Sequence, residues 1–387
     1  MSGCSSIATE ETSTKATIND IFRHYGPAYV KKFGEKMPQD QVKAIKAMIH
    51  CRSPEAGTVL YQCSNCGMKH QVPKACGNRN CPSCQGSKAR DWLEKQIDQL
   101  LPCVYFMITF TVPAEFRSFV RSHPKACYKA LFDAAYKTMV KLAKDPKYVG
   151  SSKLGVTGVL HTWGRDMSYH PHVHFIVPGG AIDQDGASWL PSRSDFFIPV
   201  HAASIIFRAK YRAEMKRCGL LDQIPDEVWS KAWIVNSQAV GDGRDSLKYL
   251  SPYVFRIAIG NHRIVSVTPG EDGQGEVVFL VKRTGTNHYR PMTVTAEEFI
   301  RRYLQHVLPR GFQKIRHFGF AHSRSKTNWE WLAMMVTTTL NLVYTLIVSA
   351  KPPRAPRTLK CCECGGDLEF VGFIRHQPER QLAFNTS

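Results

Sequence analysis

The chain of 387 residues has 51 lysines and arginines against 32 aspartates and glutamates, a formal net charge of +19, and its hydrophobic fraction is 43%. This length has room for two or more cores, and the hydrophobic fraction excludes a chain that is disordered throughout. The charge favours an anionic polymer or an anionic membrane surface as partner, with a generic basic protein as the alternative.

The two ends of the chain differ in composition from its middle. Residues 1–15 are rich in serine and threonine, and we expect a disordered tail that is no secretory signal, because a basic start and an apolar core are missing. The uncharged stretch 331–350 holds too many polar residues for a spanning helix, so we expect a buried helix and no membrane contact. We therefore expect a cytoplasmic protein. In the reducing cytosol, clustered cysteines indicate metal ligands rather than disulfides.

Apolar periodicity and turn residues predict the elements in chain order. Helices are expected at 39–50, 87–101, 114–147, 203–234 and 295–307. Strands are expected at 105–113, 154–163, 170–178, 263–267 and 276–281. A basic proline-rich linker, KPPRAPR, follows at 351–357, and no internal repeat is present.

Most of the 13 cysteines gather at two places, six within residues 51–84 and three within 361–364. The first of these segments has few large apolar residues. It contains two CxxC pairs separated by 14 residues, a spacing typical of a four-cysteine zinc site. We predict that Cys63, Cys66, Cys81 and Cys84 bind one structural zinc ion. This ion would replace the missing hydrophobic core as a source of folding free energy.

Further cysteines and histidines lie outside this predicted site. In the first segment these are Cys51, Cys76 and His70. They either complete a second zinc site or are ordinary loop residues. After the linker, Cys361 and Cys364 form one more CxxC pair, with Cys362 and His376 nearby. A metal site there is a weaker prediction, because few further ligands are close in sequence.

Three histidines alternate at the start of the expected strand 170–178: His170, His172 and His174. Alternate residues of a strand face the same way, so the three rings share one face. If 154–163 and 170–178 form an antiparallel hairpin, His161 lies beside His172 and His174, since cross-strand neighbours are about 5 Å apart. These three imidazoles are then candidate ligands of one divalent cation, and a polar histidine surface is the alternative. His170 directly follows the turn and is assigned a supporting or phosphate-binding role.

The segment SLKYLSPYVFR holds Tyr249 and Tyr253 four residues apart, which on a helix would put them on the same face, one turn apart. Alone, this spacing favours an aromatic core stripe. The neighbouring Lys248 and Arg256, together with the histidines, favour a catalytic role, because a tyrosine oxygen can act as a covalent nucleophile. Its ordinary pKa of about 10 means that attack needs a cation or a base nearby. Pro252 tends to kink a helix, so the two hydroxyls need not be equivalent.

Four stretches of the chain are similar, in the same order, to one protein family. They are CGNRNCPSCQG (76–86), LHTWGRDMSYHPHVHFIVPGG (160–180), LKYLSPYVFRIAIGNHRI (247–264) and EEFIRRYLQHVLPRGFQKIRHFGF (297–320). On these stretches the sequence resembles the two-tyrosine rolling-circle transposases of bacterial insertion sequences, which belong to the HUH endonuclease superfamily. Asn80, where many relatives have histidine, and Pro252, where many have a basic residue, depart from the family pattern.

The resemblance implies an enzyme that is a metal-dependent DNA strand transferase and site-specific single-strand endonuclease. Tyr249 and Tyr253 match the family's tyrosines, one of which attacks a DNA phosphodiester, becomes joined to the 5′ phosphate and releases a 3′ hydroxyl. Mg²⁺ or Mn²⁺ on His161, His172 and His174 orients the phosphate. The implied partners are single-stranded element ends and target DNA, in the bacterial nucleoid. The alternatives are a replication initiator or relaxase with the same chemistry, and a non-catalytic zinc-dependent DNA-binding protein.

The resemblance also implies an α+β fold, with an HUH-type antiparallel sheet flanked by helices. We expect a tail (1–15), an N-terminal zinc-binding domain (16–100), a catalytic domain (101–325) and a C-terminal region of helix, linker and CxxC pair (326–387). Basic residues near the tyrosines and in RGFQKIRHFGF are candidate phosphate contacts, with a solvated surface as the alternative. They are Lys248, Arg256, Arg310, Lys314 and Arg316.

Overall fold

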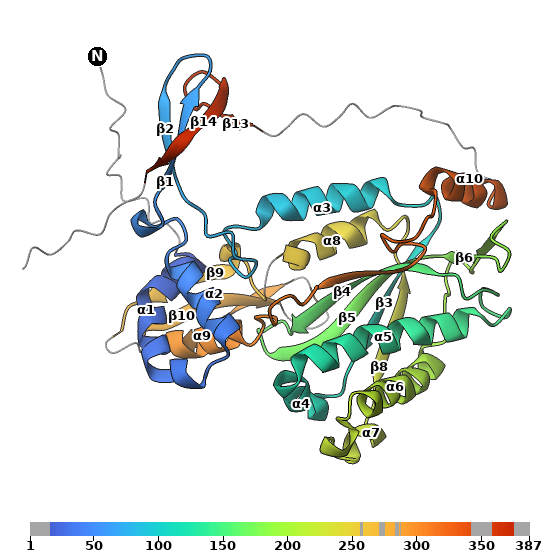
Figure 1. Cartoon of the computed structure of the whole chain (residues 1–387). Coiled ribbons are helices and arrows are strands. Elements are labelled where there is room, and N and C mark those ends of the chain that lie inside the picture. Colours follow the sequence, from blue (N-terminus) through green and yellow to red (C-terminus); the bar gives the residue numbers. More distant parts are fainter. Residues whose placement is uncertain are drawn as a thin grey trace, which may run out of the picture.

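The structure, a computed structural model, describes residues 16–255, 258–270, 275–282, 286, 288–341 and 358–374. Helices and strands are mixed along the chain, and the strands form antiparallel sheets (Figure 1). The expected α+β class is therefore confirmed. The expected tail 1–15, the linker 351–357, Arg256 and His376 lie outside the described residues.

A five-stranded antiparallel sheet forms the centre of the molecule. In spatial order its strands are β12 (Ile315–Gly319), β4 (Gly155–Trp163), β5 (Tyr169–Pro178), β3 (Tyr105–Thr111) and β8 (Ile234–Ala239). β4 and β5 form the expected hairpin, with His161 opposite His172 and Val159 opposite His174. The HUH-type antiparallel sheet predicted from the sequence is thus present, and two neighbouring interior strands, β4 and β5, carry the histidines.

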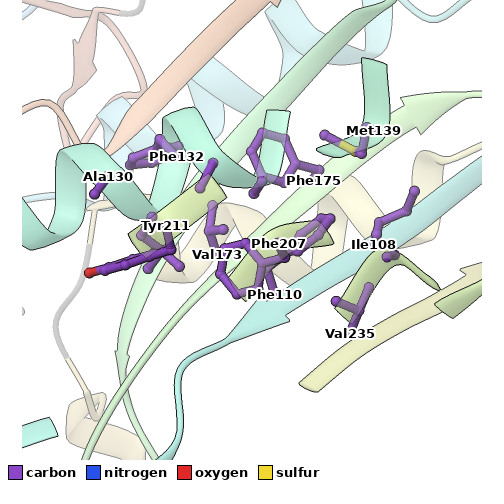
Figure 2. Close-up of a cluster of buried hydrophobic side chains, with 14 of the residues drawn as sticks. Ile108, Phe110, Ala130, Phe132, Met139, Val173, Phe175, Phe207, Tyr211 and Val235 are labelled. Atoms are coloured by element: carbon purple, nitrogen blue, oxygen red, sulfur yellow. The ribbon is translucent and has the colours of Figure 1, made fainter. Parts of the chain in front are cut away.

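One face of this sheet is covered by α5 (Pro124–Ala143) and α6 (Val200–Arg217), which pack against each other (Figure 1). Figure 2 shows the aromatic core between these helices and the sheet. The Phe110 ring meets Phe175 and Phe207 edge to face, with centroid distances of 6.0 and 5.0 Å. Because strand residues alternate, the burial of Val173 and Phe175 here turns the intervening His174 to the opposite face.

The opposite face is covered by α3 (Gly86–Asp98), α8 (Arg244–Phe255) and α10 (Trp329–Thr339) (Figure 1). Leu250 of α8 is buried with Val159 and Ile176 of the sheet. α8 therefore lies on the face that carries the histidines, and its helical backbone continues through Pro252. α10 ends at Thr339, and residues 342–350 of the expected apolar helix lie outside the described residues. Among the described helices, none has the length and apolarity that a membrane crossing requires.

A second core joins the N-terminal helices to residues 258–304. α1 (Ile18–Phe33) packs on α2 (Gln39–Ile49) and on α9 (Ala296–Leu304), where the Phe22 and Tyr303 rings meet at 5.3 Å. A three-stranded sheet completes this core, in the order β11 (Tyr289–Thr295), β10 (Glu276–Lys282) and β9 (Ile264–Thr268). Residues that we expected in the catalytic domain therefore share a core with the N-terminal domain.

A small four-stranded sheet pairs residues 58–73 with residues 359–374, and we call it the chain-end sheet. Its order is β13 (Leu359–Lys360), β14 (Asp367–Ile374), β1 (Thr58–Cys63) and β2 (Lys69–Pro73). It projects from the rest of the molecule (Figure 1). The C-terminal CxxC segment, expected in a region of its own, thus pairs with a strand of the N-terminal domain.

The remaining elements are short. They are the helices α4 (Arg117–Ser122) and α7 (Glu227–Ser230), the strands β6 (Gly180–Ile182) and β7 (Trp189–Pro191), and single 3₁₀ turns at Gly34–Lys36, Pro54–Ala56, Ala114–Phe116, Leu221–Gln223 and Asn261–Arg263. The expected helix 114–147 is divided because Pro124 begins a new helix at its first position. In place of the expected helix 203–234, α6 ends at Arg217, and strand β8 begins at Ile234.

Candidate active site and cysteine clusters

His161, His172 and His174 meet on the helix-α8 face of the β4–β5 hairpin. One ring nitrogen of each lies within 4.8 Å of those of the other two. The His161 ring centroid is 5.3 Å from that of His172 and 4.6 Å from that of His174. The structure thus brings together the three histidines predicted from alternation and cross-strand pairing, in an arrangement that fits one divalent cation.

Hydrogen bonds hold two of the three rings in place. Nδ1 of His172 donates to the carbonyl oxygen of His170 at 2.7 Å, and Nδ1 of His174 lies 2.8 Å from Oγ1 of Thr109. These contacts engage Nδ1 of each ring and leave Nε2 as the candidate ligand atom, a pattern common among metal-bound imidazoles. His161 stacks on Trp163, with centroids 4.9 Å apart. His170 therefore supports the group through its backbone.

Burial keeps all three imidazoles uncharged. Removal from water lowers the pKa of His174 to about 4. It also holds the pKa values of His161 and His172 well below the usual range, and the neighbouring imidazoles add to this effect. Because a metal binds the neutral form of histidine, the group is ready to hold a cation at neutral pH.

The three histidines open onto a cavity of about 900 Å³, which we call the histidine cavity. Tyr249 of α8 also lines it and is 52% exposed. Partial burial raises the pKa of the Tyr249 phenol, and the positive charge of Arg165 opposes this increase. Tyr253 lies one turn further along α8, and its side chain is outside the described part of the structure. One predicted tyrosine and all four histidines thus border one space.

The histidine cavity is also strongly basic. Its lining includes Arg165, Arg263, Lys282 and Arg290, and among the described lining residues Asp166 is the one acid. The Arg263 guanidinium donates to two backbone carbonyls and lies 5.9 Å from the ring of Tyr289. We did not predict these cations. Arg165 stands in the turn of the histidine hairpin and could have been noticed there, whereas Arg263 ends a 3₁₀ turn and Lys282 and Arg290 lie on strands, all far along the chain.

The predicted phosphate contacts that the structure describes lie outside this lining: Lys248, Arg310, Lys314 and Arg316. The Arg316 guanidinium covers the rings of Phe132 and Phe312, at 4.8 and 5.1 Å. The Lys314 ammonium lies 4.5 Å from the Trp163 ring, and burial lowers its pKa to about 7. Both side chains therefore have a packing role, and DNA contact by these four residues stays a prediction.

Distant residues hold the turn of the histidine hairpin. Arg302 donates to the Asp166 carbonyl of the turn at 3.1 Å. Gln305 and His306 both donate to the Met167 carbonyl, at 2.9 and 3.1 Å. The other ring nitrogen of His306 accepts from the Thr162 hydroxyl at 3.2 Å. Burial lowers the pKa of His306 to about 3, so this ring is neutral. The second core thereby positions the strands that carry the candidate ligands.

Eight of the twelve described cysteines form two groups of four, and neither group is the predicted set. The first group, the N-terminal cluster, consists of Cys51, Cys76, Cys81 and Cys84. Its sulfur atoms all lie within 4.8 Å of one another, and those of Cys51 and Cys84 are 3.3 Å apart. Cys51 and Cys81 are buried in the core of α1 and α2, where the Asn19 amide lies 3.6 Å from the Cys81 sulfur.

The second group, the chain-end cluster, consists of Cys63, Cys66, Cys361 and Cys364. The predicted site on Cys63, Cys66, Cys81 and Cys84 is therefore wrong in its grouping. The reason is that β1 and β2 carry the first CxxC pair away from the body, whereas the second packs beneath α1 and α2.

The expected second site on Cys51, Cys76 and His70 does not form either. Cys51 and Cys76 are partners of the Cys81–Cys84 pair in the N-terminal cluster. Nε2 of His70 instead lies 3.2 Å from the sulfur of Cys361, beside the chain-end cluster. Asn80, at the position where many relatives have histidine, is absent from both clusters and accepts a hydrogen bond from Tyr303 through its carbonyl.

Comparison with known proteins agrees with this architecture. A family model described as "Transposase zinc-binding domain" matches residues 21–112, which contain the whole N-terminal cluster, and one described as "Putative transposase" matches residues 155–328. The zinc-binding match and the thiol-rich clusters support Zn²⁺ as a metal of this chain.

Two relatives extend the similarity over most of the chain. "Putative transposase y4qJ" of Sinorhizobium fredii is 32% identical over 326 residues, 79% of this chain and 80% of the relative. "Transposase for insertion sequence element IS801" of Pseudomonas savastanoi pv. phaseolicola is 26% identical over 310 residues, 73% of this chain and 71% of the relative. No solved structure matches. The chain thus belongs to the rolling-circle insertion-sequence transposases of the HUH endonuclease superfamily, with an N-terminal transposase zinc-binding domain.

Proposed function

We propose that this transposase nicks and transfers single-stranded DNA by rolling-circle transposition, with a tyrosine as the nucleophile. The observation that carries the proposal is the histidine cavity, where Tyr249 borders the same space as His161, His172 and His174. A half-exposed phenol beside three neutral imidazoles and several cations suits attack on a phosphodiester, because the nucleophile, the anionic substrate and a cation can meet there.

In the proposed reaction the deprotonated Tyr249 oxygen attacks the phosphorus of the scissile phosphodiester. A bond forms between this oxygen and phosphorus, and the bond from phosphorus to the 3′ oxygen breaks. The 5′ phosphate stays on the tyrosine, and the 3′ oxygen takes up a proton. In strand transfer a 3′ hydroxyl attacks the phosphotyrosine, which restores the phosphodiester and releases the tyrosine. Tyr253, one turn further along α8, is the proposed second nucleophile.

The side chains of the cavity have separate tasks in this proposal. His161, His172 and His174 would hold Mg²⁺ or Mn²⁺, which polarises the scissile phosphate and offsets its developing charge. Thr109 and the His170 carbonyl orient two of these rings. The four cations of the lining bind neighbouring phosphates of the strand, a contact that weakens as salt rises.

The test incubates the purified protein with single-stranded DNA carrying the element ends and Mg²⁺ or Mn²⁺, and looks for an SDS-resistant protein–DNA adduct. We expect an adduct with the wild type and none with the Tyr249→Phe/Tyr253→Phe double variant. Tyr289→Phe is the matched control, because Tyr289 lines the same cavity and is also 52% exposed. No adduct with the wild type, or an adduct with the double variant, would falsify the mechanism.

A further inference from the structure

We propose that the chain-end cluster is a second zinc site, in which one Zn²⁺ joins a cysteine pair of the N-terminal domain to a pair near the C-terminus. Cys361 and Cys364 lie beyond both family matches, which end at residues 112 and 328. The proposal does not depend on the proposed DNA chemistry, since it concerns metal content and the attachment of a segment.

The sulfur positions fit a tetrahedral ion. Cys63 and Cys364 have their sulfurs 3.4 Å apart, those of Cys66 and Cys361 are 3.7 Å apart, and all four lie within 4.8 Å of one another. Four sulfurs about 2.3 Å from a tetrahedral Zn²⁺ lie about 3.8 Å from one another. A disulfide needs sulfurs about 2.05 Å apart, so the spacing fits metal ligands and not bonded pairs.

The two CxxC pairs have the same backbone turn. In each, the glycine after the second cysteine donates to the carbonyl of the first cysteine at 3.0 Å, Gly67 to Cys63 and Gly365 to Cys361. The amide of each first cysteine donates to the carbonyl five residues later, at 2.9 and 2.8 Å. Both glycines have positive φ, 69° and 70°, which glycine adopts without strain. Two equivalent turns thus face each other, and each offers two sulfurs.

Further contacts join the two turns. The Ser64 amide donates to the carbonyl of Asp367 at 3.0 Å, and β1 pairs with β14 up to Cys63 opposite Leu368. Nε2 of His70 lies 3.2 Å from the Cys361 sulfur, where an N–H donor stabilises a thiolate.

The chain-end sheet has almost no apolar interior of its own. Within residues 58–73 and 358–374, the buried side chains are those of Cys63 and Cys361, which are 2% and 3% exposed. Large apolar residues of β14 face outward, with Phe370 and Phe373 exposed by 56% and 63%. A sheet without a hydrophobic core needs another source of folding free energy, and a structural zinc ion supplies one.

The main experiment measures zinc per chain by mass spectrometry of the purified full-length protein. We expect two zinc ions in the wild type, and one in both Cys63→Ser/Cys66→Ser and Cys361→Ser/Cys364→Ser. The quadruple variant also retains one, because its four cysteines share a single ion. Cys362→Ser, which removes an adjacent thiol outside the cluster, retains two. One zinc ion in the wild type, two in Cys361→Ser/Cys364→Ser, or none in the quadruple variant overturns the proposal.

A second experiment tests whether the metal holds the segment. A protease site is placed within residues 351–357, the full-length protein is cleaved, and gel filtration shows whether the C-terminal fragment stays with the body. We expect it to stay in the wild type and in Cys362→Ser. It should dissociate after chelation, and without chelation in Cys361→Ser/Cys364→Ser. A fragment that remains attached under both of these conditions overturns the bridging role, because strand pairing alone would then suffice.

Discussion

The histidine cavity and the chain-end cluster both gather ligand-type side chains, but the chain assembles them over very different distances. His161 and His172 face each other across one hairpin, whereas Cys63 and Cys364 are separated by 301 positions in the sequence. The histidine group depends on strand period and on the register of one hairpin. The cysteine cluster depends on which distant segments the tertiary fold brings together. The histidine group is formed by local contacts and the cysteine cluster by contacts distant in sequence. Variants in one group should therefore leave the other unchanged.

The largest effect is expected for His172→Ala, which removes a proposed metal ligand from the histidine group. Loss of transition-state stabilisation by several kcal/mol lowers the cleavage rate by a factor on the order of 10³, measured on single-stranded DNA. His170→Ala is the matched control, because the carbonyl that orients His172 is retained. Zinc content should stay at the wild-type value in both variants. A loss of zinc in His172→Ala would show that the two regions are not independent.

The two cysteine clusters should differ in their effect on stability. Cys81→Ser breaks a cluster that is buried in the core of α1 and α2, and we expect a loss of several kcal/mol in the free energy of unfolding. Cys364→Ser affects the projecting chain-end sheet, so the body should unfold nearly as in the wild type. Urea denaturation followed by tryptophan fluorescence measures both. Equal losses would mean that the chain-end sheet supports the body.

A smaller effect is expected for Thr109→Val, which removes the hydroxyl beside Nδ1 of His174. Loss of such a partner weakens metal binding by about 10–100-fold, because the ring is no longer held in place. The matched control is Thr157→Val, since the Thr157 hydroxyl contacts Nδ1 of His317 at 2.9 Å, outside the candidate ligands. Titration of cleavage activity with Mn²⁺ compares the two. Similar Mn²⁺ requirements would argue against His174 as a ligand.

The smallest effect concerns His306, which links the local hairpin to the distant second core. Its pKa is about 3 in the folded protein and about 6.5 when unfolded. Below pH 6.5 the unfolded chain therefore binds one more proton, and stability falls by up to about 1.4 kcal/mol per pH unit. His306→Gln should reduce this slope between pH 6.5 and 5.5, and exposed His201→Gln should not. Unchanged slopes would exclude His306 as the titrating group.

The same contrast explains how much of the molecule could be predicted from sequence. The hairpin followed from two apolar strands around a short turn, and the shared face of the histidines followed from the period of a strand. The shared face of Tyr249 and Tyr253 was expected only if their segment was helical, and α8 supplies that helix. Arg263 and Arg290 could not be placed at the cavity, because strand periodicity does not show how a second sheet packs beside the first.

The grouping of the cysteines was beyond sequence spacing for a related reason. The predicted set followed from two CxxC pairs at a spacing typical of a four-cysteine zinc site. The outward β1–β2 hairpin and the burial of Cys81 under α1 and α2 oppose that choice. Both are tertiary effects. The partner of Cys63 could therefore be recognised only after the whole chain was folded.

The pairing of Cys63 with Cys364 also sets an order on synthesis. At roughly 5–20 residues per second, the 301 positions between them take about 15–60 s to translate. Throughout that interval the first thiol pair is already made while its partner turn does not yet exist, and Cys81 and Cys84 form the next CxxC pair along the chain. A newly made chain therefore waits until Cys361 and Cys364 have left the ribosome before the turn that carries Cys63 and Cys66 can be completed.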